Sequence, residues 1–246
     1  MEISIVFALG FISAFIGSIA GGSGLIGVPG LLMLGLPPHI ALGTFNFADV
    51  GSSIGNIIKF SQYKNLGVKW KDILILTAIA IPAAMIGAKI VVSVDPKILS
   101  KLIGVILLVL IPLLFKNKNL GVKSTPAKGA KLIWSHIAFF VARAWGGFFS
   151  PGAGLIETYV RIKGYGYTIL QGKAVTRVAN ITSGIGIVLI FASSKMIDYK
   201  LGVAMFFGML TGGYIGTSYA IKKGDAWLKP LLGIAIVITS IKMIFF

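Results

Sequence analysis

Long apolar runs separated by short basic loops constrain this chain more than any other feature of its sequence. In the first half, residues 3–20, 40–62, 73–92 and 98–115 are each close to the roughly 20 residues that a helix needs to cross a bilayer. Only 12% of the residues are charged, against roughly 25% in soluble domains. Such a chain cannot cover a water-facing surface. We therefore expect an all-α integral membrane protein, multi-pass in the cell membrane, with lipid around most of it.

Several classes of protein are excluded by residue types that the chain lacks. It has no cysteine and only two histidines, His39 and His136, so disulfides, thiolate sites and a histidine metal cluster are not expected. No nucleophile–base–acid arrangement or phosphate-binding loop is visible. The net charge of +16 lies mostly in short loops, where lysines set membrane topology and attract anionic headgroups. We expect no enzyme activity, no cofactor, no metal and no nucleic-acid partner.

The two halves of the chain repeat each other. Residues 22–26 match residues 152–156 at an offset of 130, and matches at an offset of 129 recur as far as residues 102–105 and 231–234. Internal repeats of this size are typical of secondary-transporter folds. The sequence predicts a first transmembrane repeat, a basic cytoplasmic linker and a second transmembrane repeat, with boundaries at 1–115, 116–131 and 132–246. Each repeat is expected to hold a glycine-broken helical hairpin plus three transmembrane helices.

The distribution of lysine and arginine favours inverted over parallel repeats. Cytoplasmic loops carry an excess of both residue types, and the linker is richly basic. Inverted repeats add five cations to the linker's side: Arg161, Lys163, Lys222, Lys223 and Lys229. Parallel repeats would place these five on the opposite side and weaken the bias. Inversion needs an odd number of crossings per half, so residues 3–36 should form a hairpin rather than one interrupted helix.

Glycine clusters around Pro29 and Pro151 predict two interruptions of helices within the membrane. Unwound backbone survives in hydrocarbon only where protein covers it or where it lines a cavity. Two helices that begin at such breaks would direct free amides and positive dipole ends at a shared anion. The alternative is close helix packing through small residues. The substrate-binding residues predicted at the breaks are Gly22, Ser23, Gly24, Leu25, Gly152, Ala153 and Gly154.

A polar stripe follows the third apolar segment of each half. Asn46, Asp49, Ser53 and Asn56 are spaced 3, 4 and 3 residues apart and share one helix face. Polar stripes on lipid-embedded helices face the bundle interior or a water-filled cavity. Hydrogen bonding that only holds the bundle together is the alternative. We expect Asn46 to line the substrate site and Asp49 to carry a coupling proton or help bind a cation.

The second stripe consists of Lys173, Thr176 or Arg177, Asn180 and Ser183. A charge at the centre of a membrane helix costs at least about 2.5–3.5 kcal/mol, which argues for a function of Arg177. We expect Thr176, Arg177 and Asn180 to line the same site.

Two further charges lie in apolar surroundings near the second break. Arg143 is a candidate counter-charge for the substrate, because its fork donates two parallel hydrogen bonds to anionic oxygens. Glu157 is expected to pair with Arg143 or Arg161, with proton transfer as the alternative. His39, which follows two prolines in a loop, is expected to be a cap or interface residue, with a proton relay as the alternative.

The stretch Gly17-Ser18-Ile19-Ala20-Gly21-Gly22-Ser23-Gly24, with Val28-Pro29 and the Pro37-Pro38-His39 turn that follow it, resembles the sulfite exporter TauE/SafE family. The length and the duplicated plan fit that family across nearly the whole chain. The resemblance implies transport of sulfite, sulfonates or related anions, coupled to an ion gradient. The second half departs from the pattern at Arg143, Arg177 and a Gly-Tyr-Gly-Tyr turn at residues 164–167.

Together these features predict a secondary transporter for a small sulfur-containing or organic anion. Its partners would be that anion and the lipid bilayer. A passive anion channel is the first alternative, and flux kinetics distinguish the two because transporters saturate and counter-exchange. An intramembrane enzyme with Asp49 and Glu157 as catalytic carboxylates is the second, and product formation in proteoliposomes would reveal it.

Overall fold

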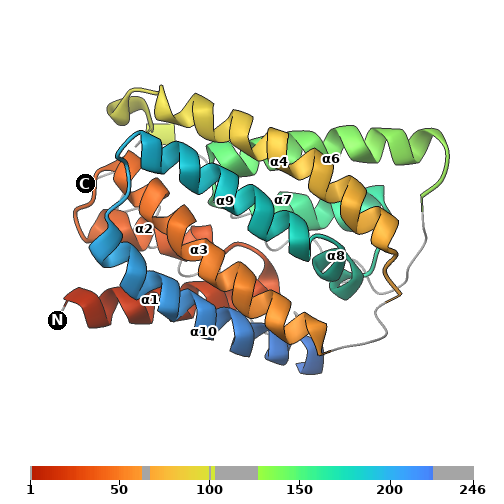
Figure 1. Ribbon diagram of the computed structural model, residues 1–246, viewed down its shortest axis with the longest axis horizontal. Helices are drawn as coiled ribbons and strands as arrows, with labels where there is room; N and C mark the ends of the chain where they lie inside the picture. The colour runs from red at the N-terminus through yellow and green to blue at the C-terminus, as the bar shows by residue number, and fades with distance from the viewer. Residues whose placement is uncertain (1, 63–66, 100, 103–126, 224–246) are drawn as a thin grey trace.

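The computed structural model describes residues 2–62, 67–99, 101–102 and 127–223, and these contain helices and loops but no strand (Figure 1). Most of the helix expected over residues 98–115, most of the linker and residues 224–246 fall outside the described residues. The helices are α1 (Glu2–Ala20), α2 (Gly24–Met33), α3 (Pro38–Ser61), α4 (Trp70–Val92), α6 (Ala130–Phe148), α7 (Ala153–Tyr159), the π-helical turn η1 (Val160–Gly164), α8 (Ile169–Val175), α9 (Arg177–Ser193) and α10 (Tyr199–Lys223).

Three of the described helices, α1, α4 and α10, are long and apolar enough to cross a membrane. Their outward faces expose large apolar side chains, as does that of α6. Trp70 and Trp134 lie in the first turns of α4 and α6 and are 67% and 69% exposed. Tryptophan favours the membrane–water interface. The outer surface is therefore that of a protein surrounded by lipid.

The glycine break of each half closes a helical hairpin. In the first half, α2 returns along α1, because Gly17 contacts Ser23, Gly27 contacts Ser13 and Gly30 contacts Leu9. The hairpin expected for residues 3–36 is thus present. In the second half, α7 and η1 return along α6 in the same way, with Gly146 beside Ala153 and Gly164 beside Ser135.

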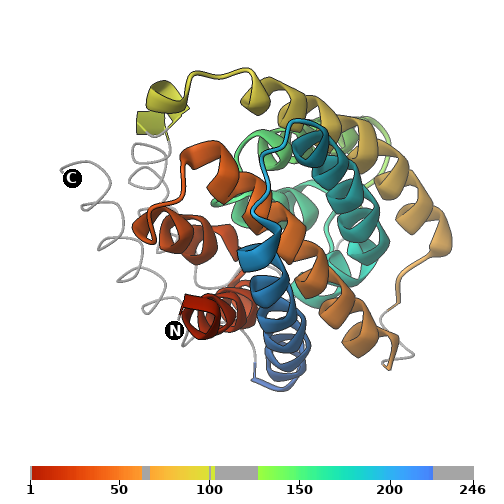
Figure 2. The ribbon, with the colours of Figure 1, turned by 60° about the vertical axis from the view of Figure 1, so that its left-hand side comes forward.

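The last described long helix of each half, α4 or α10, packs mainly on the other half. α10 packs most extensively on α1 and α3, whereas α4 packs most extensively on α6 and α9. Figure 2 shows α10 between α1 and α3. α1, α3 and α10 thus form one group of helices, and α4, α6 and α9 form a second. α3 and α9 contact each other and join the two groups. In Figure 1, α1 and α3 run from left to right, whereas α6 and α9 run from right to left.

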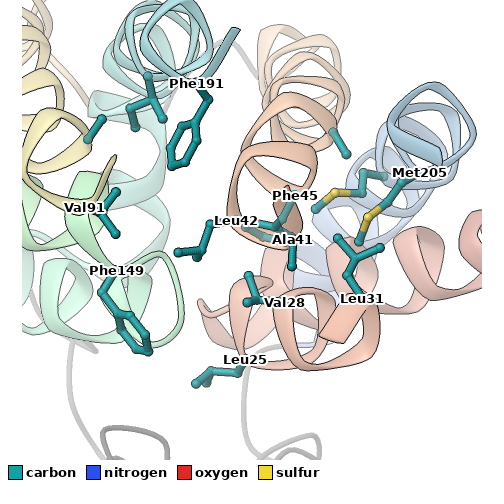
Figure 3. Close-up of a cluster of buried hydrophobic side chains, with 14 of the residues drawn as sticks. Leu25, Val28, Leu31, Ala41, Leu42, Phe45, Val91, Phe149, Phe191 and Met205 are labelled. Carbon is teal, nitrogen blue, oxygen red and sulfur yellow. The ribbon is translucent and has the colours of Figure 1, made fainter. Parts of the chain in front are cut away.

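A large apolar cluster joins the two groups at one end of the molecule. Its buried members include Leu42 and Phe45 of α3, Phe149 at the second break and Phe191 of α9. Figure 3 shows these side chains converging with Met205 of α10 and residues of α2. His39 is buried here as well, and its Nε2 lies 3.0 Å from the carbonyl oxygen of Val91. His39 therefore lies between α3 and α4, in the first turn of α3 and not in the loop expected for it.

The third segment of the second half is not one helix. The sequence indicated a continuous stripe from Lys173 to Ser183, but α8 ends at Val175 and α9 begins at Arg177. α8 has its own start signal, a capping box in which Thr168 and Gln171 exchange hydrogen bonds of 3.2 and 3.1 Å. The correction matters because the break at Thr176 lies against the candidate site.

Glycine lets α4 and α6 approach each other at backbone distance. A Cβ atom at Gly147 would collide with the carbonyl oxygen of Ala84, and the neighbouring backbone cannot move aside as a side chain could. Replacing Gly147 by alanine is therefore expected to lower the melting temperature markedly, by forcing apart helices that share a long contact. Gly184→Ala is the control, because its nearest neighbour would lie at an ordinary 3.5 Å. Equal melting temperatures of the two variants in detergent would contradict this packing.

Candidate anion site

A cavity of about 180 Å³ lies between the two hairpins and the two polar stripes. It is bordered by the end of α1, the middle and end of α3, the end of α6, and parts of α7, α8 and α9. Both halves of the chain contribute to its wall. Its size suits a small ion or molecule, and its position matches the site predicted between the breaks.

The two glycine breaks contact each other directly beside this cavity. A Cβ atom on Gly154 would lie 3.2 Å from the amide nitrogen of Gly22, and one on Gly24 would lie 2.9 Å from the nitrogen of Pro151. Gly22 and Gly152 adopt φ angles of +138° and +77°, a region that side chains other than glycine rarely enter. Glycine is therefore needed both for the turns and for the close approach.

The backbone amides at the breaks divide into free and occupied ones. Within the described part of the chain, the amides of Gly22, Ser23 and Gly154 have no hydrogen-bond acceptor, and these residues line the cavity. The amide of Leu25 donates to the carbonyl of Gly22 at 2.9 Å, and that of Ala153 donates to the carbonyl of Ser150 at 3.3 Å.

These contacts correct part of the predicted site. The amides of Leu25 and Ala153 are already used within their own turns, although Ala153 still borders the cavity. Leu25 belongs to the apolar cluster, Gly24 lies where the two breaks cross, and Gly152 turns the second break with a φ of +77°. None of the three borders the cavity. Gly24 lets the two breaks approach each other, and Gly152 lets the second break turn.

Three charged side chains form a buried network on one wall. Glu157 Oε2 lies 3.4 Å from Nη2 of Arg143 and 3.3 Å from Nη1 of Arg161. Glu157 and Arg161 are each only 6% exposed. Arg161 also donates to the hydroxyls of Thr158 and Thr176, at 2.8 and 3.1 Å. The expected pairing of Glu157 is thus observed, with both arginines at once.

The arginines differ in how many partners they have. Arg143 donates to the side-chain oxygen of Asn180 in addition to its ion pair, but its Nε is buried without a partner among the described residues. Arg177 lines the cavity, and no described residue forms a hydrogen bond or ion pair with its side chain. Arg161 holds the fold together and Arg143 is largely occupied by Glu157 and Asn180, whereas Arg177 retains its donors for a ligand.

The first polar stripe faces the same cavity. Asp49 accepts a hydrogen bond from the hydroxyl of Ser23 at 3.1 Å, which joins the stripe to the first break. Asn46 accepts one from Ser150 at 3.1 Å, which joins it to the second break. Ser53 and Asn56 also border the cavity. The stripe therefore turns inward, as its position on a lipid-embedded helix requires.

The structure brings together most of the predicted site residues. The cavity wall includes ten of them: Gly22, Ser23, Asn46, Asp49, Arg143, Ala153, Gly154, Thr176, Arg177 and Asn180. Their binding of a substrate stays a prediction. Arg161 was expected among the cations of the cytoplasmic side, and this prediction was wrong because its side chain is buried in the cavity wall. The spacing of Glu157 and Arg161, four residues apart, was the signal for an ion pair on one helix face.

The charges on the wall are unbalanced. Four basic side chains (Arg143, Arg161, Lys173 and Arg177) face two carboxylates (Asp49 and Glu157). A surplus of positive charge in a confined space attracts anions. Among the described residues, no group of histidine, cysteine, aspartate and glutamate could hold a metal ion.

An apolar helical fold around a polar, charged cavity is the architecture of a membrane transport protein. The chain belongs to the sulfite exporter TauE/SafE family, whose sequence profile matches residues 6–243. The resemblance at the first glycine break therefore extends over nearly the whole chain.

Named relatives agree with this assignment. A probable membrane transporter protein of Haemophilus influenzae is 27% identical over 99% of this chain and 94% of its own length. The probable membrane transporter protein YfcA of Escherichia coli K12 is 26% identical over 99% of this chain and 90% of its own. YdhB of Bacillus subtilis, also named a probable membrane transporter protein, is 25% identical over 99% of both chains. No solved structure matches the chain.

Proposed function

We propose that this protein is a secondary transporter, multi-pass in the cell membrane, that moves a small sulfite- or sulfonate-like anion and couples its movement to an ion gradient. The observation that carries the proposal is Arg177, an arginine without a described protein partner, beside a cavity formed by two helix breaks. The family's name and the surplus of positive charge on the wall both support an anionic substrate.

In this mechanism the substrate lies between the breaks and accepts hydrogen bonds from both halves. The free amides of Gly22, Ser23 and Gly154 serve as uncharged donors. Arg177 supplies the charge and the donors, and Arg143 adds a second positive charge on the wall. The oxygens of a sulfur oxyanion are arranged around sulfur in a pyramid or a tetrahedron, and they can accept hydrogen bonds from donors that converge from several directions.

We further propose inverted repeats that rock against each other for alternating access. The opposite directions of α1 and α6, and of α3 and α9, support this arrangement. Lys69, Lys71 and Lys131 lie where α4 and α6 begin, at one end of the molecule. By the excess of lysine in cytoplasmic loops, this end faces the cytoplasm.

Asp49 is the proposed carrier of the coupling proton or ligand of a coupling cation. Its carboxylate is bonded to Ser23 at the first break, so a change in its charge acts directly on the backbone that contacts the substrate. A coupling group must sense the substrate site in this way, because coupling is a free energy shared between two bound species.

Binding and exchange measurements test the proposed function. Sulfite, sulfate, thiosulfate, sulfonates and carboxylates are added to purified protein, and stabilisation follows RT ln(1 + [L]/Kd), about 2.7 kcal/mol at 100 times Kd. We expect sulfite or a sulfonate to raise the melting temperature most. Liposomes preloaded with that anion should then transiently accumulate its labelled form from outside. Conduction without such counterflow would indicate a channel, and stabilisation by none of these anions would contradict the proposed substrate class.

A further inference from the structure

The break at the end of α1 leaves two particular carbonyl groups without their helical partners. In a continuing helix, the carbonyls of Ser18 and Ile19 would accept from the amides of Gly22 and Ser23, four residues further on. The positive φ angles of Gly21 and Gly22, +76° and +138°, turn the chain away after Gly21. The last helical hydrogen bond there runs from Gly21 to Gly17, at 2.7 Å.

The side chain of Lys173, in α8, donates hydrogen bonds to both of these carbonyl groups. Its Nζ donates to the carbonyl oxygen of Ile19 at 2.7 Å and also to that of Ser18. The lysine comes from the other half of the chain and lies on the cavity wall. Its ammonium group thus sits on the C-terminal end of a helix that stops inside the protein.

Such a helix end is a cation site on physical grounds. The C-terminal carbonyls carry about half a negative charge from the helix dipole. In transporters with broken helices, unwound carbonyls and half-helix C-termini are the groups that coordinate a coupling sodium ion. An ammonium group supplies the same charge with three hydrogen-bond donors, and here it is attached covalently to the protein.

We propose that the ammonium group of Lys173 occupies the cation site at the end of α1, so that the transporter does not bind or require sodium there. This inference rests on the proposed function, because it concerns the ion that accompanies the anion. It leaves the carboxyl group of Asp49, rather than the end of α1, as the place for coupling, and it assigns a proton rather than sodium to that carboxyl group. Lys173 therefore contributes its positive charge to the cavity, while its ammonium group donates to the end of α1 instead of to the substrate.

Sodium replacement on the wild-type protein tests the inference without any transport assay. Purified protein is melted in sodium chloride and in choline chloride of equal ionic strength. The melting temperatures should agree, whereas occupancy of a specific sodium site would raise the first by about 2–4 °C or more. A sodium-specific rise overturns the inference. Anion counterflow in the same salts should show equal rates, and a failure of counterflow in every salt would count against the proposed function only.

Variants of Lys173 provide the second arm. Lys173→Met removes the charge at nearly constant length, and it should melt lower in choline and regain part of the loss in sodium. Lys173→Arg keeps the charge and should remain insensitive to sodium. Lys200→Met, an exposed lysine at the start of α10, is the matched control and should behave as the wild type. If Lys173→Met melts like the wild type in choline, the inference is wrong. If Lys173→Met does not fold, the wild type and Lys173→Arg still test the inference. A higher melting temperature of either protein in sodium than in choline contradicts it.

Discussion

Replacing Arg177 by glutamine is expected to abolish anion exchange and to leave the protein folded and inserted. Arg177 borders the cavity, and no described residue pairs with its side chain, so its loss leaves no carboxylate unpaired. Hydrogen bonds from a charged donor contribute about 1.5–3 kcal/mol each. Losing one such bond weakens binding by on the order of 10- to 100-fold, and losing two removes measurable exchange.

Counterflow in liposomes and the melting temperature in detergent measure the two parts of this prediction separately. Arg177→Lys keeps the charge but loses the two-pronged donor geometry, so it should retain partial activity. Lys195→Gln, which removes a charge outside the cavity, is the control and should exchange normally. Normal exchange by Arg177→Gln would refute the assignment of this arginine to the substrate site. A collapse of its melting temperature would indicate a structural role instead.

Replacing Glu157 by glutamine should strongly lower the melting temperature, unlike the replacement of Arg177. Glu157 is the carboxylate between Arg143 and Arg161, and both the glutamate and Arg161 are buried. Removing one partner of a buried ion pair costs about 3–5 kcal/mol, because the remaining charge is left uncompensated. Two arginines in a space that already holds Lys173 and Arg177 would then repel each other.

The melting temperature of Glu157→Gln, compared with that of Glu2→Gln, provides the measurement. Glu2 is exposed at the start of α1, so its replacement tests the loss of a carboxylate without burial. Sulfite should partly restore the stability of Glu157→Gln, since an anion in the cavity supplies the missing negative charge. A melting temperature equal to that of the wild type would show that the arginines do not need this carboxylate.

Much of the fold follows from local sequence signals. Apolar runs of membrane-spanning length predict α1, α3 and α4 within a few residues, and glycines around Pro29 and Pro151 predict both breaks. The regular spacing of Asn46, Asp49 and Asn56 correctly predicted an inward-facing stripe. These features depend on the periodicity of one helix or on the backbone freedom of glycine, which a single sequence displays directly.

The features that sequence analysis missed depend on contacts between distant segments. The hydrogen bond of Leu25 to Gly22 follows from how tightly the first break turns, which composition does not reveal. The pairing of Arg161 with Glu157 was one of two that were expected, but the burial of Arg161 and its hydrogen bonds to two threonine hydroxyls were not predicted. The capping box of Thr168 and Gln171 signals where α8 begins, but it does not indicate the split at Thr176, and the polar stripe from Lys173 to Ser183 favoured one long helix.

α4 packs mainly on helices of the second half and α10 on helices of the first half, which affects how the protein assembles during synthesis. α1 and α3 leave the ribosome first, yet the helix that covers them, α10, is synthesised more than a hundred residues later. Until then, the small residues of α1 and α3 that face it lie against lipid or against the membrane insertion machinery. The amino-terminal half produced alone would lack this cover, and co-expression of the two halves as separate chains would restore it only by their association.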